Sequence, residues 1–208
     1  MTETAAEVSA PLGRRERKKQ DTRRALKDAA LSLAQQNGIE HVTVEDITDA
    51  VGVSPRTFFN YFDCKEDALV GQTTGVSEEV HAAILARPAD EPVLQTLRYA
   101  VAESHLLQEA HSHREQMLAR QRLVHQNPAL MARQLAQAVA LERTLAAALT
   151  ERMGADPNED LRPQLLASVA VGVLRVALRR WAREGARLDD LIDESFATLT
   201  AELSAPSA

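Results

Sequence analysis

Arg56, Thr57, Asn60 and Tyr61 form a short run of polar side chains with the chemistry needed to read double-stranded DNA. An arginine can donate two hydrogen bonds to guanine, and a threonine can bond a base edge or pack on a thymine methyl group. An amide and a phenol suit phosphate oxygens, which set the register of a protein on DNA rather than its sequence preference. The run therefore predicts a DNA recognition helix, provided that its neighbours hold it in a helix-turn-helix.

Residues 43–65 carry the signals of two short helices joined by a tight turn. Thr43 is a favourable N-cap followed three residues later by an acid, an acidic variant of the capping box. Gly52 tolerates the left-handed backbone that often ends a helix. Ser54 can cap the next helix, with Pro55 at its first position, where a missing N–H costs nothing. Apolar residues at helical spacing are predicted to face inward: Val44, Ile47, Val51, Phe58 and Phe62.

A helix of barely two turns is not stable alone and must be held by its neighbours. An ordinary helical hairpin with a solvated face is the alternative interpretation of the same residues. On the DNA-binding interpretation, the contacting residues are predicted to be Thr43, Ser54, Pro55, Arg56, Thr57, Phe59, Asn60, Tyr61 and Lys65.

Four successive segments, TVEDI, AVGVS, RTFFNYF and KEDAL, resemble the DNA-binding domain of TetR-type repressors over roughly residues 14–75. This resemblance implies a three-helix bundle followed by an all-helical ligand-binding and dimerisation domain, with residues 55–61 in the major groove. The C-terminal segments NPALMARQLAQ, LRRWAREG and LDDLIDESFATL more loosely resemble mycofactocin-system-type TetR regulators over roughly residues 127–203. That second resemblance implies an acyl-coenzyme-A-like effector in actinobacteria.

The 208 residues are 45% hydrophobic but only 3% aromatic, which argues against a β-rich fold. A single cysteine, Cys64, excludes an intramolecular disulfide framework. We find no signal-peptide pattern at the N-terminus, and the longest apolar run, residues 165–174, is far shorter than the ~20 residues of a membrane span. We therefore expect a cytoplasmic protein without a membrane partner.

The formal net charge of −6 at first disfavours a nucleic-acid partner, but the charge is unevenly distributed. Residues 14–27 hold eight Lys/Arg and two Asp/Glu, a local balance of +6. Residues 66–208 hold 14 Arg and 20 Asp/Glu, a balance of −6. This asymmetry suits a DNA-facing module attached to an acidic remainder. A constitutive DNA-architectural protein, a third class, lacks an extended basic surface beyond the N-terminal region.

The chain is predicted to be all-α, with about nine helices and no convincing strand. We divide it into a disordered tail (1–13), a helix-turn-helix domain (14–64) and a helical ligand-binding and dimerisation domain (65–208). Asp63 is predicted to cap one continuous helix that runs from residue 64 or 65 to about Leu85 and connects the domains. The remaining helices outside the turn are predicted at about 15–36, 92–110, 113–125, 128–153, 164–184 and 188–203.

The last two helices are long and amphipathic, so they could pack within the chain or pair with a second copy in a four-helix bundle. A two-fold dimer would double the DNA site and impose a palindromic operator. Predicted dimer-interface residues are Val169, Val173, Val176, Leu191, Phe196 and Leu199, with Gly172 permitting close approach. A pocket for a small, mostly apolar effector is predicted among Tyr99, Met117, Gln121, Met131, Gln134 and Trp181.

His105, Glu109 and His113 recur every four residues, so a continuous helix would place them on one face, where they could bind a divalent metal. A polar stripe near a helix end is the alternative. Phosphate-binding loops, nucleophile elbows and Cys-x-x-Cys pairs are missing from the sequence. We therefore expect no enzyme activity and no cofactor, and we keep a metal-binding helical protein or enzyme that uses these three residues as the second hypothesis.

Overall fold

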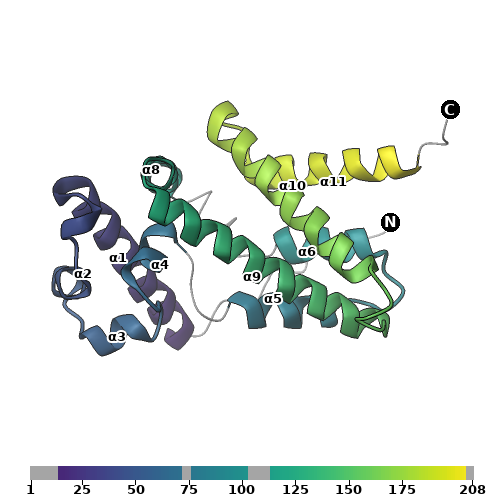
Figure 1. The fold of residues 1–208 in the computed structure, drawn as a ribbon, viewed down its shortest axis with the longest axis horizontal. Helices are drawn as coiled ribbons and strands as arrows, with labels where there is room; N and C mark the ends of the chain where they lie inside the picture. The colour runs from purple at the N-terminus through teal and green to yellow at the C-terminus, as the bar shows by residue number, and fades with distance from the viewer. Residues whose placement is uncertain (1–13, 72–75, 103–112, 205–208) are drawn as a thin grey trace, which may run out of the picture.

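The computed structural model describes residues 14–71, 76–102 and 113–204, and every regular element within these ranges is helical. Two groups of helices lie side by side, and the long helix α9 (Pro128–Met153) runs from one group to the other (Figure 1). The described ranges contain ten α-helices and one 3-10 turn. The predicted all-α class is confirmed, with ten described helices against about nine predicted.

The first group packs around aromatic and aliphatic side chains from the N-terminal third of the chain. Phe58 and Phe62 lie at its centre, with 0% and 1% of their surface exposed. Leu26 and Ile47 close the same core from two other helices. The elements of this group are α1 (Arg14–Asn37), η1 (Ile39–His41), α2 (Val44–Val51), α3 (Pro55–Phe59) and α4 (Lys65–Val70).

The second group is larger, and its core is built from leucine, alanine, valine and one tryptophan. Leu145 and Leu149 of α9 pack there against small residues such as Ala167 and Ala170. Small residues at this contact let the helices approach closely, and α9 and α10 accordingly share an extensive interface. The other helices of this group are α5 (Val76–Leu85), α6 (Val93–Ala102), α10 (Arg162–Glu184) and α11 (Leu188–Ser204), whereas α8 (Arg114–Gln126) packs beside α1 and α4 of the first group as well as against α9 (Figure 1).

The connection between the groups differs from the single helix that the sequence suggested. α4 ends at Val70, because Gly71 adopts a left-handed backbone with φ of 89°, and α5 begins only at Val76. The N-cap of α4 is Cys64, which makes no side-chain capping bond, so the predicted cap at Asp63 is wrong. α4 itself joins the first core through Ala68 and Leu69.

Two residues from later helices also enter the first core. Val124 of α8 and Leu130 of α9 are 1% and 0% exposed and pack with the N-terminal helices. The first hydrophobic core therefore holds side chains from both sides of residue 64, and the domain division at that residue stays a prediction. None of the helices within the described ranges is long and apolar enough to cross a membrane.

Candidate DNA-binding surface and ligand-binding region

Both ends of α2, the first helix of the helix-turn-helix, carry the capping features that the sequence signals predicted. The Thr43 N–H donates to Asp46 Oδ2 at 2.9 Å, and the Asp46 N–H donates to Thr43 Oγ1 at 3.1 Å, which completes the capping box. The Thr43 hydroxyl also donates to Asp46 Oδ2, at 2.6 Å, and this bond together with the one from the Thr43 N–H holds the pKa of the Asp46 carboxyl below its usual value. Gly52 ends α2 in the left-handed conformation with φ of 75°. The helix-turn-helix is thus built as predicted.

α3 is a five-residue helix held from both ends. Ser54 Oγ accepts a hydrogen bond from the Thr57 N–H at 3.2 Å, and Pro55 occupies the first turn. On its inner side, the Phe58 ring lies 5.2 Å from the Phe62 ring, a distance suited to aromatic packing. This buried aromatic pair supplies the stability that so short a helix lacks by itself.

The outer side of α3 presents the side chains predicted to contact DNA. Arg56 and Asn60 are exposed, Thr57 and Tyr61 are half-buried, and Phe59 keeps 54% of its surface accessible. An aromatic ring left this open on a short, well-supported helix is available to pack on sugars or on thymine methyl groups. The remaining predicted residues, Thr43, Ser54 and Pro55, are also exposed.

Lys65, unlike the other predicted DNA contacts, has its charged group bonded within the protein. Its ammonium group donates to the carbonyl oxygens of Ile39 at 3.1 Å and of Val42 at 2.8 Å, so the side chain turns toward the loop before α2. The DNA role of Lys65 stays a prediction and would have to use the third ammonium donor. Sequence spacing gave no sign of these carbonyl partners, because they lie 26 and 23 residues away.

The basic residues of α1 lie in two different environments, some exposed and one buried. Arg14, Arg15, Lys18 and Lys19 are exposed on its first turns, as a DNA-facing surface requires. Lys27, by contrast, is only 3% exposed. It belongs to the junction between the two groups of helices rather than to the outer surface.

α4 is tied to α9 by an ion pair at this junction. Arg133 donates from Nε and Nη2 to the two carboxylate oxygens of Asp67 at 2.6 and 2.7 Å, and Gln137 adds a bond at 3.2 Å. Burial disfavours the charged form of Asp67, but the bonds and charge of Arg133 outweigh it and hold the pKa below its usual value. Cys64 donates to the same carboxylate, and burial raises the pKa of its thiol, which lowers its reactivity.

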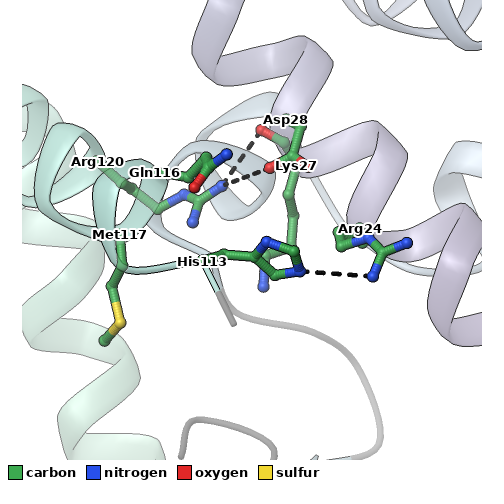
Figure 2. Close-up of a pocket in the computed structure, with 7 residues that line it drawn as sticks. All are labelled: Arg24, Lys27, Asp28, His113, Gln116, Met117 and Arg120. Atoms are coloured by element: carbon green, nitrogen blue, oxygen red, sulfur yellow. Dashed lines mark hydrogen bonds and ion pairs between the residues drawn. The ribbon is translucent and has the colours of Figure 1, made fainter. Parts of the chain in front are cut away.

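A hollow lies between α1 and α8 at the same junction (Figure 2). Arg120 of α8 reaches across it and donates to the Lys27 carbonyl at 3.3 Å, with Asp28 Oδ1 3.9 Å away. On the other side of the hollow, His113 lies 3.4 Å from an Arg24 guanidinium nitrogen. The lining residues are Arg24, Lys27, Asp28, His113, Gln116, Met117 and Arg120.

The structure places the six predicted effector-pocket residues on α6, α8, α9 and α10, and their membership of one effector pocket stays a prediction. Met117 lines the hollow and also packs against the second core. Trp181 is 2% exposed, with the Arg114 guanidinium 4.5 Å above its ring, and the Tyr99 ring is covered by Arg87 at 3.9 Å. The other three lie on α8 and α9 outside the hollow: Gln121 half-buried, Gln134 exposed and Met131 47% exposed.

The predicted dimer-interface residues divide into two sets. Val173, Leu191 and Phe196 are at most 9% exposed and pack in the core of their own subunit, so they are not available to a second copy. Helical periodicity identified their apolar face but could not say which neighbour covers it. Val176 is 44% exposed, and the remaining two, Val169 and Leu199, are half-buried.

Two leucines missing from that prediction are among the most exposed apolar residues described. Leu161 at the N-cap of α10 and Leu165 in its first turn are 64% and 62% exposed. They share the spacing of four residues with Val169, so the same periodicity could have found them. Gly172 and Val176 continue this exposed side of α10.

The metal-site hypothesis depends on two residues that the structure does not describe, so it stays a prediction. His105 and Glu109 lie outside the described residues, and His113 is the N-cap residue of α8 beside Arg24. The described ranges contain no group of three or more His, Cys, Asp or Glu side chains arranged to hold a metal ion.

Comparison with known proteins matches both halves of the chain. Residues 26–70 match the sequence family described as bacterial regulatory proteins, tetR family, and residues 91–204 match the MftR C-terminal domain. The chain is 36% identical to the HTH-type transcriptional regulator TcmR of Streptomyces glaucescens over 187 residues, 86% of this chain and 82% of that protein. It is 26% identical to a Mycobacterium tuberculosis protein described provisionally as the mycofactocin biosynthesis transcriptional regulator MftR, over 90% and 93% of the two chains.

The fold has solved counterparts. One is Thermus thermophilus FadR, a TetR family transcriptional repressor crystallised in complex with lauroyl-CoA. It superposes with a TM-score of 0.50 and 22% identity, covering 89% of this chain and 97% of that one. The match to the MftR C-terminal domain begins at residue 91, well before the loose resemblance drawn from residue 127.

Proposed function

Because this chain belongs to the TetR family of bacterial transcriptional regulators, we propose that it is a repressor that binds a palindromic operator as a dimer. We further propose that a small, mostly apolar ligand releases it from DNA. Its family consists of regulators rather than enzymes. Its place of action is the cytoplasm, where the operator is, and its partners are double-stranded DNA, the effector and a second copy of itself.

The observation that carries the proposal is the outer side of α3. α3 exposes Arg56 and Phe59, with its exposed C-cap residue Asn60 beside them, while the buried Phe58 holds its inner side. A recognition helix that enters the major groove needs its outer side free for DNA, so its stability must come from its inner side. Arg56 is the candidate for guanine recognition, and Tyr61 the candidate for a phosphate contact.

Dimerisation is proposed to use the exposed side of α10. Leu161, Leu165 and Val176 remain open to solvent on this helix within one subunit, an unusual amount of exposed apolar surface for a single helix. Pairing of two α10 helices about a two-fold axis would cover these residues. It would also present two α3 helices to successive major grooves, roughly 34 Å apart on B-DNA.

The effector is proposed to bind among α6, α8 and α9, near the predicted residues Tyr99, Gln121, Met131 and Gln134. α9 has an exposed apolar edge there, in which Met131, Leu135 and Val139 are 47%, 66% and 40% exposed. The relative FadR binds lauroyl-CoA, a ligand with a long apolar chain. An acyl-coenzyme-A-like effector would suit such an edge.

Release from DNA requires that the effector favour one of two conformations. A ligand shifts such an equilibrium only by its difference in affinity between the two states. The Asp67–Arg133 pair is the physical link through which a displacement of α9 reaches α4 and the DNA-binding helices. In the ligand-bound state, the two α3 helices would stand at a separation that does not match the operator.

The test is a gel-shift of the purified protein on the DNA that flanks its own gene, at two salt concentrations. A discrete, competitor-resistant shift over a palindrome is expected, weakened strongly by salt because phosphate contacts release counterions. Arg56→Ala and Tyr61→Ala should severely weaken the shift while helix content and dimerisation stay intact. Arg183→Ala, which removes a 78%-exposed arginine near the far end of α10, is the matched control. Parent-like binding by both the Arg56→Ala and the Tyr61→Ala variants would refute the groove assignment.

A further inference from the structure

Helix α8 connects the two groups of helices, because its side chains enter both hydrophobic cores. Met117 and Leu118, in its first half, pack against the second core, and Leu123 and Val124, in its second half, pack with the first. The same helix lies beside α1 and α4 and against α9 (Figure 1). A helix of 13 residues is a stiff element about 20 Å long, so a displacement at one end of α8 reaches the other.

The first residue of α8 binds the C-terminal end of α10. Arg114 Nη2 donates to the Trp181 carbonyl oxygen at 2.9 Å, and the Arg114 guanidinium carbon lies 4.5 Å from the centre of the Trp181 ring. The same carbonyl accepts the N–H of Gly185, the residue that ends α10, at 3.4 Å. A cation is favourable at a helix C-terminus, and its position over an indole ring adds a second attraction.

The end of α10 that Arg114 contacts is held firmly in the second core. Trp181 is only 2% exposed and belongs to that core together with Val173 and Ala177. Because protein cores are close-packed, an indole ring buried in this way does not move unless its neighbours repack. The Arg114 guanidinium therefore rests on a rigid part of α10, the helix whose exposed side is proposed to pair with a second subunit.

The other contacts of α8 reach the DNA-binding helices. Arg120 donates to the Lys27 carbonyl oxygen of α1 at 3.3 Å, and its Cδ lies 3.3 Å from the point where a Cβ on Gly71, at the end of α4, would stand. Val124, 1% exposed, packs in the same core as Phe58 of α3. Direct contacts therefore run from the end of α10 through α8 to the helices that support α3.

We propose that Arg114 is a positioning residue for operator binding, which fixes the DNA-binding helices of each subunit relative to α10. The inference rests on the proposed function, because it requires a dimer on a palindrome. With Arg114 in place, the two α3 helices stand at one separation, so binding of the first half-site gives the second α3 helix a high effective concentration at the other. Without this contact, the DNA-binding helices have more freedom relative to α10, and the effective concentration falls.

The test compares two duplexes, the operator palindrome found by gel-shift and the same duplex with one half-site scrambled. Arg114→Met removes the hydrogen bond and the charge but keeps a long side chain. Its affinity for the palindrome should fall about tenfold, whereas its affinity for the single half-site should stay within about twofold of the parent value. Arg122→Met, which replaces an exposed arginine of the same helix, is the matched control and should bind both duplexes like the parent.

The spacing of the half-sites gives a second readout. One base pair inserted between them moves them apart by about 3.4 Å and rotates them by roughly 35°. The parent should lose most of its affinity for this third duplex, and Arg114→Met should lose less, because its DNA-binding helices are less strictly placed. A variant that had only lost stability would bind all three duplexes more weakly by the same factor and would keep the spacing preference of the parent.

Trp181 is the one tryptophan of the chain, so its fluorescence checks on the same samples that the end of α10 stays buried. If Arg114→Met fails this check, Arg114→Lys, which keeps a cation at the ring, carries the same comparison with a smaller expected change. Equal losses on the palindrome and the half-site, or an unchanged spacing preference, would overturn the inference. A parent that binds the palindrome no better than the half-site would refute the dimer of the proposed function instead.

Discussion

The helix-turn-helix (α2 and α3) and the long helix α10 both have an apolar and a polar side, yet different kinds of contact determine their structures. In the helix-turn-helix, capping bonds join residues three positions apart, between Thr43 and Asp46 before α2 and between Ser54 and Thr57 before α3. On α10 the same apolar periodicity continues from buried Val173 to exposed Val176, and only the neighbouring helices separate them. Local chemistry thus specifies the DNA-binding unit, whereas the regulatory helices depend on contacts between distant parts of the chain.

The largest test of this contrast replaces two adjacent aromatic residues of α3. Phe58→Ala should lower the free energy of unfolding by about 3–5 kcal/mol, because it empties a fully buried site. Phe59→Ala, at a 54% exposed position, should leave stability within about 0.5 kcal/mol and weaken operator binding instead. Urea unfolding and fluorescence anisotropy on labelled operator DNA separate the two effects. Equal losses of stability would mean that α3 has no free outer side.

A second test breaks the ion pair that joins the two regions. Arg133→Ala leaves the Asp67 carboxylate, 8% exposed, with weaker partners and should cost about 1–3 kcal/mol at neutral pH. The estimate stays below that for a fully buried pair because the Arg133 side chain is 39% exposed. Unfolding by urea at a series of pH values measures the loss.

The pH dependence of this loss identifies its origin. The folded protein lowers the pKa of Asp67, so the stabilisation is complete above the unfolded pKa of about 3.9 and disappears as pH falls through the folded value. The difference between parent and Arg133→Ala should therefore shrink below about pH 4. Arg183→Ala serves as the control, since it removes an exposed arginine of α10 that takes no part in the α4–α9 ion pair. A difference that stays constant down to strong acid would point to lost packing rather than lost charge.

Features that depend on local chemistry could be predicted from the sequence, whereas features that depend on distant contacts could not. Capping by Thr43 and Ser54 and the inward side of Phe58 were all predictable, because each depends on residues within one turn of helix. The break at Gly71 was not predicted, although glycine there permits the left-handed backbone and the close approach of Arg120. Such contacts between distant segments leave no periodic signal in a single sequence.

In the candidate DNA-binding site, the charged residues show most clearly which positions a single sequence can predict and which it cannot. Exposed Arg56 was placed correctly on α3 by local spacing alone. Lys27 and Lys65 carry the same charge in the same unit, but one is buried at the junction and the other bonds two backbone carbonyls. The position of a long, flexible cation depends on which acceptors the completed fold brings near it.

Removing a single helix cap should have a moderate effect that distinguishes the two regions. Thr43→Ala deletes a side chain that accepts the Asp46 N–H and should cost about 1 kcal/mol. His113→Ala at the N-cap of α8 should change stability by less than about 0.5 kcal/mol, because His113 makes no capping bond. Thermal and urea unfolding of both variants give the comparison. A larger effect for His113 would show that α8 relies on its first residue as strongly as α2 does.

The smallest expected change concerns Gly172, in the middle of α10. We predicted that this glycine permits close approach, but within the subunit a Cβ added there would meet nothing within 4 Å. Gly172→Ala should therefore stabilise the helix of one subunit by about 0.5–1 kcal/mol. If a second copy packs against this side of α10, as proposed, the added methyl group should also raise the dimer dissociation constant about tenfold, which sedimentation equilibrium measures.

Gly71→Ala provides the contrasting glycine in the same fold. With φ of 89° and Arg120 Cδ 3.3 Å from the new Cβ, it should destabilise rather than stabilise. A gain in stability at Gly172 without any change in dimerisation would place the second copy elsewhere on the molecule. The apolar periodicity of α10 is the same whether or not a second subunit packs there. The dimer dissociation constant of Gly172→Ala therefore decides whether another subunit covers the exposed side of α10.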